Sequence, residues 1–224
     1  MRLLAVETST LAGGVALLDG DRLRGESVLD VTATHSERLL PAIDRLLAEA
    51  GWRPDSLEAL AVAVGPGSFT GLRIGLSVIK GLALALGLPV AAVPTLDAMA
   101  EALPYAAWPV CPVLDARKGE VYACRYRWAD GAMRREWDYL ALPPAALAAR
   151  LTEPAILLGD GAALVASPHA WLAPPHRRVP SPGAVAVLGA ARLAAGQTVS
   201  PADLVPIYLR PSEAELKRRA VAVP

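Results

Sequence analysis

Short apolar runs at the start of the chain alternate with turn residues, a pattern that predicts β-strands. The apolar runs cover residues 3–6, 15–18 and 23–28, and glycine-containing turns at 12–14 and 19–21 separate them. Because turns this short join antiparallel neighbours, we expect three antiparallel strands to open the fold.

Further along, apolar residues recur every three or four positions, which is the period of a helix. This spacing predicts a helix over 35–50, and the chain then alternates between strand and helix at 59–64, 68–86, 89–93 and 95–103. An antiparallel triplet followed by alternating helices and strands favours an α/β fold with a mixed sheet.

The second half of the sequence partly repeats the first. Residues 113–124 match the opening hairpin, and each copy has a carboxylate, Glu7 or Asp115, at the end of its first strand. This duplication predicts two related lobes that meet at a cleft, an N-terminal lobe over 1–105 and a smaller, degenerate C-terminal lobe over 106–224.

Regular patterns weaken after Tyr139. We expect a strand to end at 157–159 and an amphipathic helix over 184–195. Twelve of the twenty prolines follow residue 142, which indicates long connections in this part of the chain.

A glycine-rich turn joins the apolar strand at 59–64 to the next helix. The turn begins at Gly65 and Gly67, which tolerate positive φ angles, and Ser68 or Thr70 can cap the helix. The spacing of the glycines does not match a P-loop or a dinucleotide fingerprint. We therefore interpret Gly65, Gly67 and Ser68 as a tight turn, with an anion site at the helix N-terminus as the alternative.

Two glycines four residues apart, Gly71 and Gly75, leave one side of this helix without side chains. Each helical glycine costs about 0.8–1 kcal/mol relative to alanine, so we expect a close backbone contact to offset the loss. The helix also carries more apolar residues than one buried face needs. We therefore predict a partner interface on the helices at 35–50 and 68–86, made by Leu39, Ile43, Leu46, Phe69, Gly71, Leu72, Gly75, Leu76 and Ile79. The alternative is that these residues only cover the sheet and each other.

Composition narrows the class of protein. The chain has 224 residues, is 54% hydrophobic and carries 22 basic and 22 acidic residues, so no net charge draws it to nucleic acid or to a membrane surface. Cys111 and Cys124 are its two cysteines, and the most apolar segment, 82–93, is too short to cross a bilayer. We expect a reduced, cytoplasmic protein without a membrane span.

Candidate catalytic residues are sparse. The three histidines, His35, His169 and His176, lack the spacing of metal ligands, so we expect no metal site. Ser9, Ser36 and Ser68 have no evident histidine and carboxylate partners, so capping or turn roles are favoured over nucleophilic ones.

Several motifs together resemble one family. They are Glu7-Thr-Ser-Thr10, His35-Ser-Glu37, the run from Gly65 to Gly75, Asp115-Ala-Arg117 with Glu120-Val-Tyr122, and Pro206-Ile-Tyr-Leu-Arg210. In these motifs the chain resembles the bacterial TsaB (YeaZ) family of tRNA threonylcarbamoyladenosine biosynthesis proteins. The resemblance implies two ribonuclease-H-like lobes of the actin, sugar-kinase and Hsp70-like ATPase superfamily, and similarity in fold to the catalytic partner TsaD.

The resemblance also implies a non-catalytic role. Catalytic relatives carry a His-x-x-x-His pair after the strand that follows the glycine-hinged helix, whereas residues 94–99 here contain no histidine. In place of the phosphate-binding glycine the first strand ends in a threonine- and serine-rich segment, which indicates a vestigial nucleotide cleft lined by Glu7, Thr8, Ser9, Thr10 and Asp115. We expect no cofactor on this chain, with ATP and metal bound by partner subunits.

The implied partners are TsaD, bound through a four-helix interface, and the ATPase TsaE, with tRNA reached indirectly through the complex. A homodimer through the same surface is expected when TsaD is absent. The alternatives are an enzyme, either metallopeptidase-like or a kinase or ATPase, and a homodimeric RNA-binding module that uses Arg125, Arg127, Arg134 and Arg135 as a basic strip.

Overall fold

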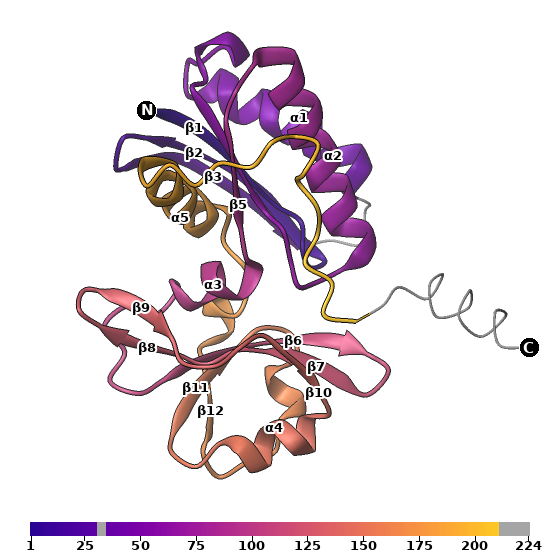
Figure 1. Cartoon of the computed structure of the whole chain (residues 1–224), viewed down its shortest axis with the longest axis vertical. Helices are drawn as coiled ribbons and strands as arrows, with labels where there is room; N and C mark the ends of the chain where they lie inside the picture. The colour runs from indigo at the N-terminus through magenta and orange to yellow at the C-terminus, as the bar shows by residue number, and fades with distance from the viewer. Residues whose placement is uncertain (31–34, 211–224) are drawn as a thin grey trace, which may run out of the picture.

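The computed structural model, which describes residues 1–30 and 35–210, has two lobes, each built around one sheet (Figure 1). The first sheet has the order β3-β2-β1-β4-β5. Its strands are β1 (Arg2–Glu7), β2 (Ala12–Asp19), β3 (Arg22–Asp30), β4 (Ala59–Ala63) and β5 (Val90–Val93). β2 is antiparallel to β1 and β3, whereas β4 is parallel to β1 and β5. The predicted antiparallel opening and the mixed sheet are confirmed.

The second sheet repeats this arrangement. Its order is β10-β7-β6-β11-β12, and β6 pairs antiparallel with β7 and parallel with β11, as β1 does with β2 and β4. A hairpin of β8 and β9 is attached to β6. The strands are β6 (Val110–Arg117), β7 (Glu120–Ala123), β8 (Tyr126–Ala129), β9 (Ala132–Arg135), β10 (Leu140–Leu142), β11 (Ala155–Leu158) and β12 (Ala170–Leu172). The duplication expected from the sequence is therefore present in the strand order.

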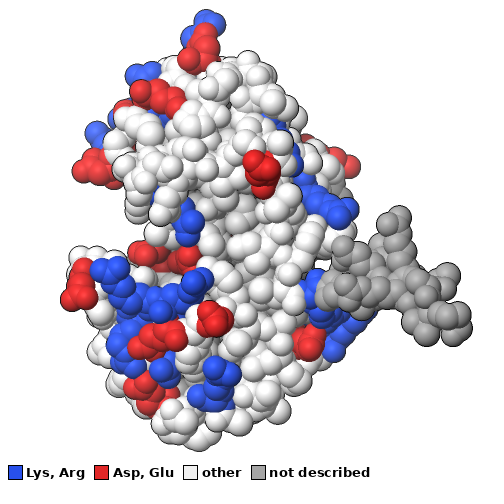
Figure 2. All heavy atoms as spheres, in the orientation of Figure 1, with Lys and Arg blue, Asp and Glu red and all other residues white. Residues whose placement is uncertain are grey.

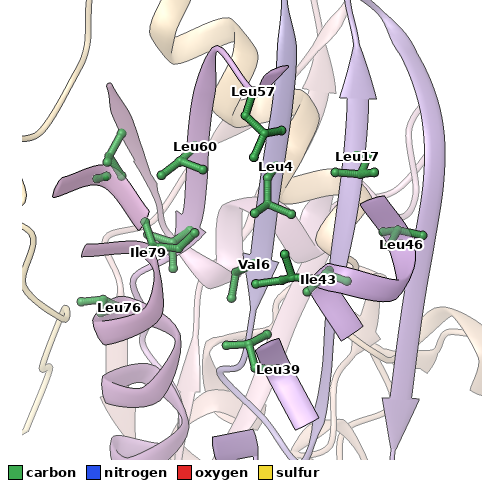
Figure 3. Packing of buried hydrophobic residues seen from close by; sticks show 14 of the residues in the cluster. Leu4, Val6, Leu17, Leu39, Ile43, Leu46, Leu57, Leu60, Leu76 and Ile79 are labelled. Atoms are coloured by element: carbon green, nitrogen blue, oxygen red, sulfur yellow. The ribbon is translucent and has the colours of Figure 1, made fainter. Parts of the chain in front are cut away.

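Helices cover both faces of the first sheet. Leu4 and Val6 of β1 pack in the cluster under α1 (His35–Glu49) and α2 (Phe69–Leu86), whereas Leu3 and Ala5 pack under α5 (Pro182–Ala194) (Figure 3). Burial on both sides explains why β1 reads as a continuous apolar run. The remaining helical segments are α3 (Thr95–Ala100), α4 (Pro144–Arg150) and the short 3₁₀ turns Pro54–Ser56, Ala162–Leu164 and Pro175–Arg177.

The predicted extent of the C-terminal lobe, 106–224, needs correction. α5 packs against β1, β2, β4 and β5, and a Cβ at its Gly189 would clash with Ala61 of β4. Beyond α5 the chain follows the edge of β5, where the Val199 amide donates to the Val90 carbonyl over 2.9 Å. α5 and the segment that directly follows it therefore belong with the first sheet, because that sheet is apolar on both faces and α5 covers the second of them.

The two cysteines lie on opposite faces of the second sheet. Cys111 of β6 packs in the cluster with Val113, while Cys124, just after β7, packs in the cluster with Leu114 and Tyr126. Both thiols are free and buried, and burial raises the pKa of Cys111 to about 12 and that of Cys124 to about 11. The second sheet lies between the two thiols and keeps them apart.

Candidate functional site

The glycine-rich turn is held tightly against the end of β1. Gly65 has a φ of 102°, and a Cβ there would approach the Leu72 side chain within 2.9 Å. A Cβ at Gly67 would clash with the Ser9 carbonyl, to which the Ser68 amide donates over 2.6 Å. Ser68 also caps α2, because its hydroxyl accepts from the Gly71 amide over 3.2 Å. These contacts support the interpretation of the three residues as a tight turn.

The glycine side of α2 faces its own sheet, which contradicts the predicted interface. Thr8 donates a hydrogen bond to the Gly71 carbonyl over 2.8 Å, and a Cβ at Gly75 would clash with the Thr8 hydroxyl. The close contact that offsets the helical glycines is therefore with β1. The small residues let α2 approach the strand, and no partner is needed to explain them.

Most other residues of the predicted interface are also core residues. Leu39, Ile43, Leu46, Leu72, Leu76 and Ile79 are each at most 8% exposed and form one buried cluster with β1 and β4 (Figure 3). Phe69 is the exception at 37% exposed, but its ring stacks on Tyr208 at 5.2 Å and the Arg73 guanidinium lies 3.8 Å from its centre. The alternative interpretation, in which these residues cover the sheet, is the correct one for this set.

The opposite side of α2 is open, and sequence reasoning missed it. Ser77, Gly81 and Ala85 recur every four residues and are exposed, and a Cβ at Gly81 would have nothing within 4 Å. Beside them Leu84 is 74% exposed, and Leu40 on the neighbouring α1 is 50% exposed. The helix therefore has two small-residue sides, one against β1 and one facing outward with apolar neighbours.

This apolar surplus also appears in the composition of α2. Among the described residues it is the one helix that is long and apolar enough to cross a membrane, with 18 residues and a mean hydropathy of 1.5. Of its residues, 33% are buried inside the protein. Contact with the sheet accounts for its buried side, and Ile74, Val78 and Leu82 are half-buried against the same core. Leu84 is the leucine of this helix that lies exposed on the surface of the first lobe.

A cleft of about 580 Å³ separates the end of β1 from the turn between β6 and β7. Ser9, Thr10 and Asp115 line it, as predicted, but Glu7 and Thr8 are fully buried and do not. The structure adds Asp160, which accepts the Asp115 amide over 2.9 Å. The sequence gives no indication of Asp160, because the weak pattern after Tyr139 leaves its place in the fold undefined.

The carboxylates of the cleft region are engaged within the chain. Asp115 pairs with Arg117 at 3.0 Å. Glu7 accepts a short hydrogen bond from the Ser9 amide, and desolvation by burial raises its pKa to about 7. Within residues 1–30 and 35–210, no group of three or more His, Cys, Asp or Glu side chains could hold a metal ion.

A C-terminal strap, residues 199–210, closes one side of the cleft. The Ile207 amide donates to the Val64 carbonyl over 2.7 Å, and the Tyr208 hydroxyl accepts from Arg73 over 3.1 Å. At its end Arg210 pairs with Glu120 of β7 at 2.7 Å, so the strap links the two lobes. The motif at 206–210 therefore has a structural role, because its residues bind to both lobes.

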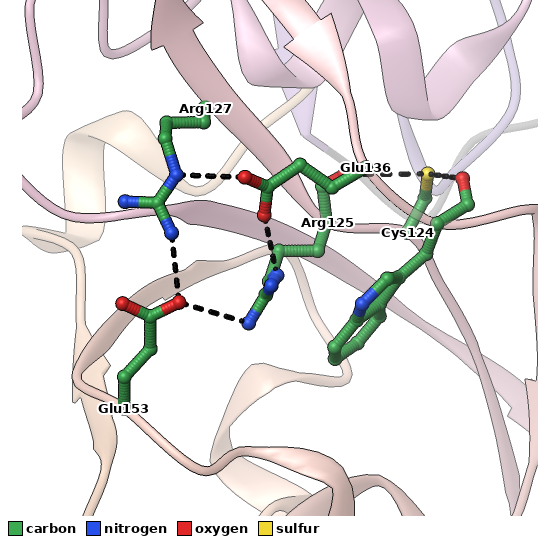
Figure 4. A network of polar contacts seen from close by, with 6 residues as sticks. Cys124, Arg125, Arg127, Glu136 and Glu153 are labelled. Carbon is green, nitrogen blue, oxygen red and sulfur yellow. Dashed lines mark hydrogen bonds and ion pairs between the residues drawn. The ribbon is translucent and has the colours of Figure 1, made fainter.

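The proposed basic strip of the second lobe is partly neutralised. Arg125 and Arg127 both pair with Glu136 at 2.7 Å, and Glu153 bridges the same two guanidinium groups at 3.2 and 2.7 Å (Figure 4). Arg134 and Arg135 of β9 are exposed, and among the described residues neither pairs with a carboxylate. The Arg135 guanidinium lies 4.7 Å from the centre of the Tyr139 ring. The strip therefore divides into a closed ion-pair network, an arginine stacked on a tyrosine and the exposed Arg134.

Comparisons with known proteins identify the family. The model of the TsaD family, described as tRNA N6-adenosine threonylcarbamoyltransferase, matches residues 30–153. The TsaB protein of Bacillus subtilis (strain 168) is 31% identical over 227 residues, covering 97% of each chain. The solved structure of YeaZ from Pseudomonas aeruginosa has a TM-score of 0.79 and 33% identity, covering 93% of this chain and 99% of that one.

A more distant neighbour shows the fold alone. The activator of 2-hydroxyisocaproyl-CoA dehydratase from Clostridium difficile, solved with bound ADPNP, has a TM-score of 0.53 at 8% identity and covers 88% of this chain and 97% of that one. The paired lobes thus share the fold of this activator, in agreement with the expected actin-like fold. The near-complete alignment with TsaB and the TsaD-family match over more than half of the sequence show that this chain belongs to the TsaB (YeaZ) family of tRNA threonylcarbamoyladenosine biosynthesis proteins.

Proposed function

We propose that this chain is a non-catalytic scaffold of a cytoplasmic tRNA threonylcarbamoyladenosine complex. It binds TsaD through the outward sides of α1 and α2, and TsaE joins the assembly. ATP, metal and the transfer chemistry belong to the partner subunits. The observation that carries the proposal is the open side of α2, where Ser77, Gly81 and Ala85 lie next to the exposed Leu84.

Small residues at four-residue spacing favour a helix partner. They allow two helix axes to approach closely, while flanking leucines fill the grooves on either side. Leu84 leaves 74% of its surface in water, so burying it against TsaD stabilises a complex by about 1–2 kcal/mol at this single position. A second copy of the chain can occupy the same surface when TsaD is absent, because both partners would present the same small-residue side.

The position expected to carry catalytic histidines supports a non-catalytic role. Residues 94–99 contain none, and α3 at this place buries Leu96, Ala98 and Met99 in the core. Side chains that pack the core there are not available to reacting groups.

Reconstitution tests the role. Purified TsaD, TsaE, ATP, threonylcarbamoyl adenylate as the group donor and unmodified tRNA are incubated with the full chain, with its Leu84→Glu variant or with Leu164→Glu, a matched change at a leucine 50% exposed on the second lobe. We expect Leu164→Glu to support modification fully and Leu84→Glu to reduce it at least tenfold. Equal modification when the chain is left out would refute the proposal.

A further inference from the structure

We propose that the cleft between the lobes binds a phosphate monoester that carries hydroxyl groups. Its phosphate lies at the N-terminus of α2, and its hydroxyl groups face Asp160 of the second lobe. The cleft has a volume of about 580 Å³, within the usual range of small-molecule sites. This inference goes beyond the scaffold role, because the outward residues Ser77, Gly81 and Ala85 do not line the cleft.

The N-terminus of α2 forms one wall of the cleft, where Gly67, Ser68 and Phe69 line it. The Ser68 amide donates to the Ser9 carbonyl, whereas the amides of Phe69 and Thr70 have no acceptor among the described residues. Because they begin an 18-residue helix, these amides lie at the positive end of the helix dipole. Free amides in this position favour an anion.

A buried hydroxyl group beside this N-terminus has no partner. Ser9 is 1% exposed and lines the cleft, and its Oγ makes no hydrogen bond to the described residues. It adjoins the start of the helix, because a Cβ at Gly67 would lie 2.7 Å from the Cβ of Ser9. Buried hydroxyl groups normally have a partner, since leaving one without a hydrogen bond costs free energy. A phosphate oxygen supplies this partner, because it accepts from a hydroxyl as well as from amides.

The facing wall carries basic residues in an unusual backbone conformation. Arg117 and Lys118 of the β6–β7 turn line the cleft, and their φ angles are 63° and 55°. Residues other than glycine, asparagine and aspartate rarely adopt positive φ angles. Such conformations are retained where the surrounding structure or the function of a site requires them. Two basic side chains at this turn therefore agree with a role for their charge in the cleft.

Ion pairs within the chain use only part of the hydrogen-bonding capacity of the cleft arginines. Arg117 pairs with Asp115 at 3.0 Å and Arg210 pairs with Glu120 at 2.7 Å, each through one guanidinium nitrogen. A guanidinium group has five N–H donors, so both arginines keep donors for a second oxyanion. Figure 2 shows basic side chains at the end of the second lobe that carries this turn, with an acidic side chain beside them.

The carboxylate of Asp160 favours hydroxyl groups next to the phosphate. One of its oxygens accepts the Asp115 amide over 2.9 Å, and the other has no partner among the described residues. A carboxylate oxygen accepts from a hydroxyl group but repels a second phosphate, so the cleft favours a monophosphate over a phosphate chain. The β1–β2 turn at 8–11 agrees with this, because it has no glycine that would let backbone amides approach further phosphates.

Calorimetric titration of the full chain tests the inference, with inorganic phosphate as the minimal probe. Ribose 5-phosphate and AMP represent the two sources of a hydroxyl-bearing monophosphate, and the tighter ligand identifies the source. We expect at least one of them to bind more tightly than inorganic phosphate, and MgATP to bind no more tightly than AMP.

Ser9→Ala tests the phosphate end of the site. It should weaken the binding of every phosphate compound at least about tenfold, the factor expected for one hydrogen bond to a charged group. The matched control is Thr95→Val, because it removes another buried hydroxyl group without a partner that does not line the cleft. Thr95→Val should bind like the parent. Neither variant should lose stability in thermal unfolding, since no hydrogen bond within the chain is removed.

Asp160→Asn tests the hydroxyl end of the site. Asparagine keeps an oxygen for the Asp115 amide but loses the negative charge. Binding of inorganic phosphate should therefore not weaken, whereas the preference for the hydroxyl-bearing monophosphate should fall at least about threefold. A purely structural role of Asp160 would change both affinities by the same factor.

Three results would overturn the inference. The first is the absence of binding by all of these phosphate compounds at millimolar concentration, and the second is unchanged binding by a folded Ser9→Ala variant. The third is tighter binding of MgATP than of AMP, which would show a site for a phosphate chain. TsaD binding is measured with the same variants and should be unchanged, so failure here is distinguishable from failure of the scaffold proposal.

Discussion

The two lobes share one strand order but differ in the helices that cover it. Between β4 and β5 the first lobe has the 18-residue α2, whereas between β11 and β12 the second lobe has the three-residue turn Ala162–Leu164. Likewise the 15-residue α1 corresponds to the seven-residue α4. A repeated sheet therefore gives two different surfaces. Among the described residues, the long helices that cover the α1 and α2 side of a sheet belong to the first lobe.

The ends of the equivalent strands β1 and β6 also differ. Glu7 is fully buried with its pKa raised to about 7, whereas Asp115 lines the cleft and pairs with Arg117. The carboxylate at the end of β1 therefore lies in the protein interior, whereas the carboxylate at the end of β6 faces the cleft. The equivalent strand ends of the duplicated motif therefore do not present matching carboxylates to the cleft.

The largest expected effect on stability distinguishes a substitution on the buried small-residue side of α2 from one on its outward side. Gly75→Leu should lower the free energy of unfolding by about 3 kcal/mol or more, because the side chain would be forced against Thr8 and Val6. Gly81→Leu, with open space around it, should raise stability by up to about 0.8 kcal/mol through helix propensity. Urea denaturation compares them, and equal stability of the two variants would mean that Gly75 does not face β1.

The next effect concerns Glu7 and pH. Its pKa is raised from 4.5 to about 7 in the folded state, so the folded protein favours the protonated form. The contribution of Glu7 to stability should therefore be fully present below about pH 4.5, decrease as pH rises to about 7 and then level off, a change on the order of 3 kcal/mol. Glu7→Gln should remove most of this decrease in urea denaturation at pH 5 and pH 7.5. A parent protein whose stability does not change across this range would contradict the buried position of Glu7.

A moderate effect is expected where the lobes join. Asp97 of α3 accepts hydrogen bonds from Tyr126 and Tyr139, each over 2.7 Å, and pairs with Arg192 of α5 at 3.3 Å. Asp97→Ala should lower stability by about 2 kcal/mol, since it leaves two phenol groups without their acceptor. Thermal unfolding followed by circular dichroism measures the change. A loss below about 0.5 kcal/mol would show that the lobes are held together by other contacts.

The smallest expected effect on stability is at Asp115. Asp115→Asn removes an ion pair with Arg117, whose side chain is 72% exposed, so we expect a change of less than about 1 kcal/mol. The contrast with Glu7→Gln tests whether the equivalent strand ends have diverged. A loss of more than about 1 kcal/mol for Asp115→Asn in urea denaturation would contradict this expectation.

Sequence patterns predicted the strands of the first sheet, α1, α2, the repeated hairpin and the family. They did not predict which side of α2 meets the sheet, because Gly71 and Gly75 form one small-residue side and Ser77, Gly81 and Ala85 form another. The decisive contact comes from Thr8, 63 residues away from Gly71 in the chain. The position of α5 was missed for a related reason, since an apolar helix gives no indication of which of two sheets it covers.

Binding of TsaD to the outward side of α2 is the most direct test of the scaffold account. Calorimetric titration measures the affinity of TsaD for the full chain, for Gly81→Leu and for Leu164→Glu. Gly81→Leu places a large side chain on the outward side of α2, and Leu164→Glu is a matched change on the second lobe. The account predicts that Gly81→Leu, while remaining folded, binds at least tenfold more weakly, a loss of about 1.4 kcal/mol or more, and that Leu164→Glu binds like the parent. Undiminished binding by a folded Gly81→Leu variant would contradict it.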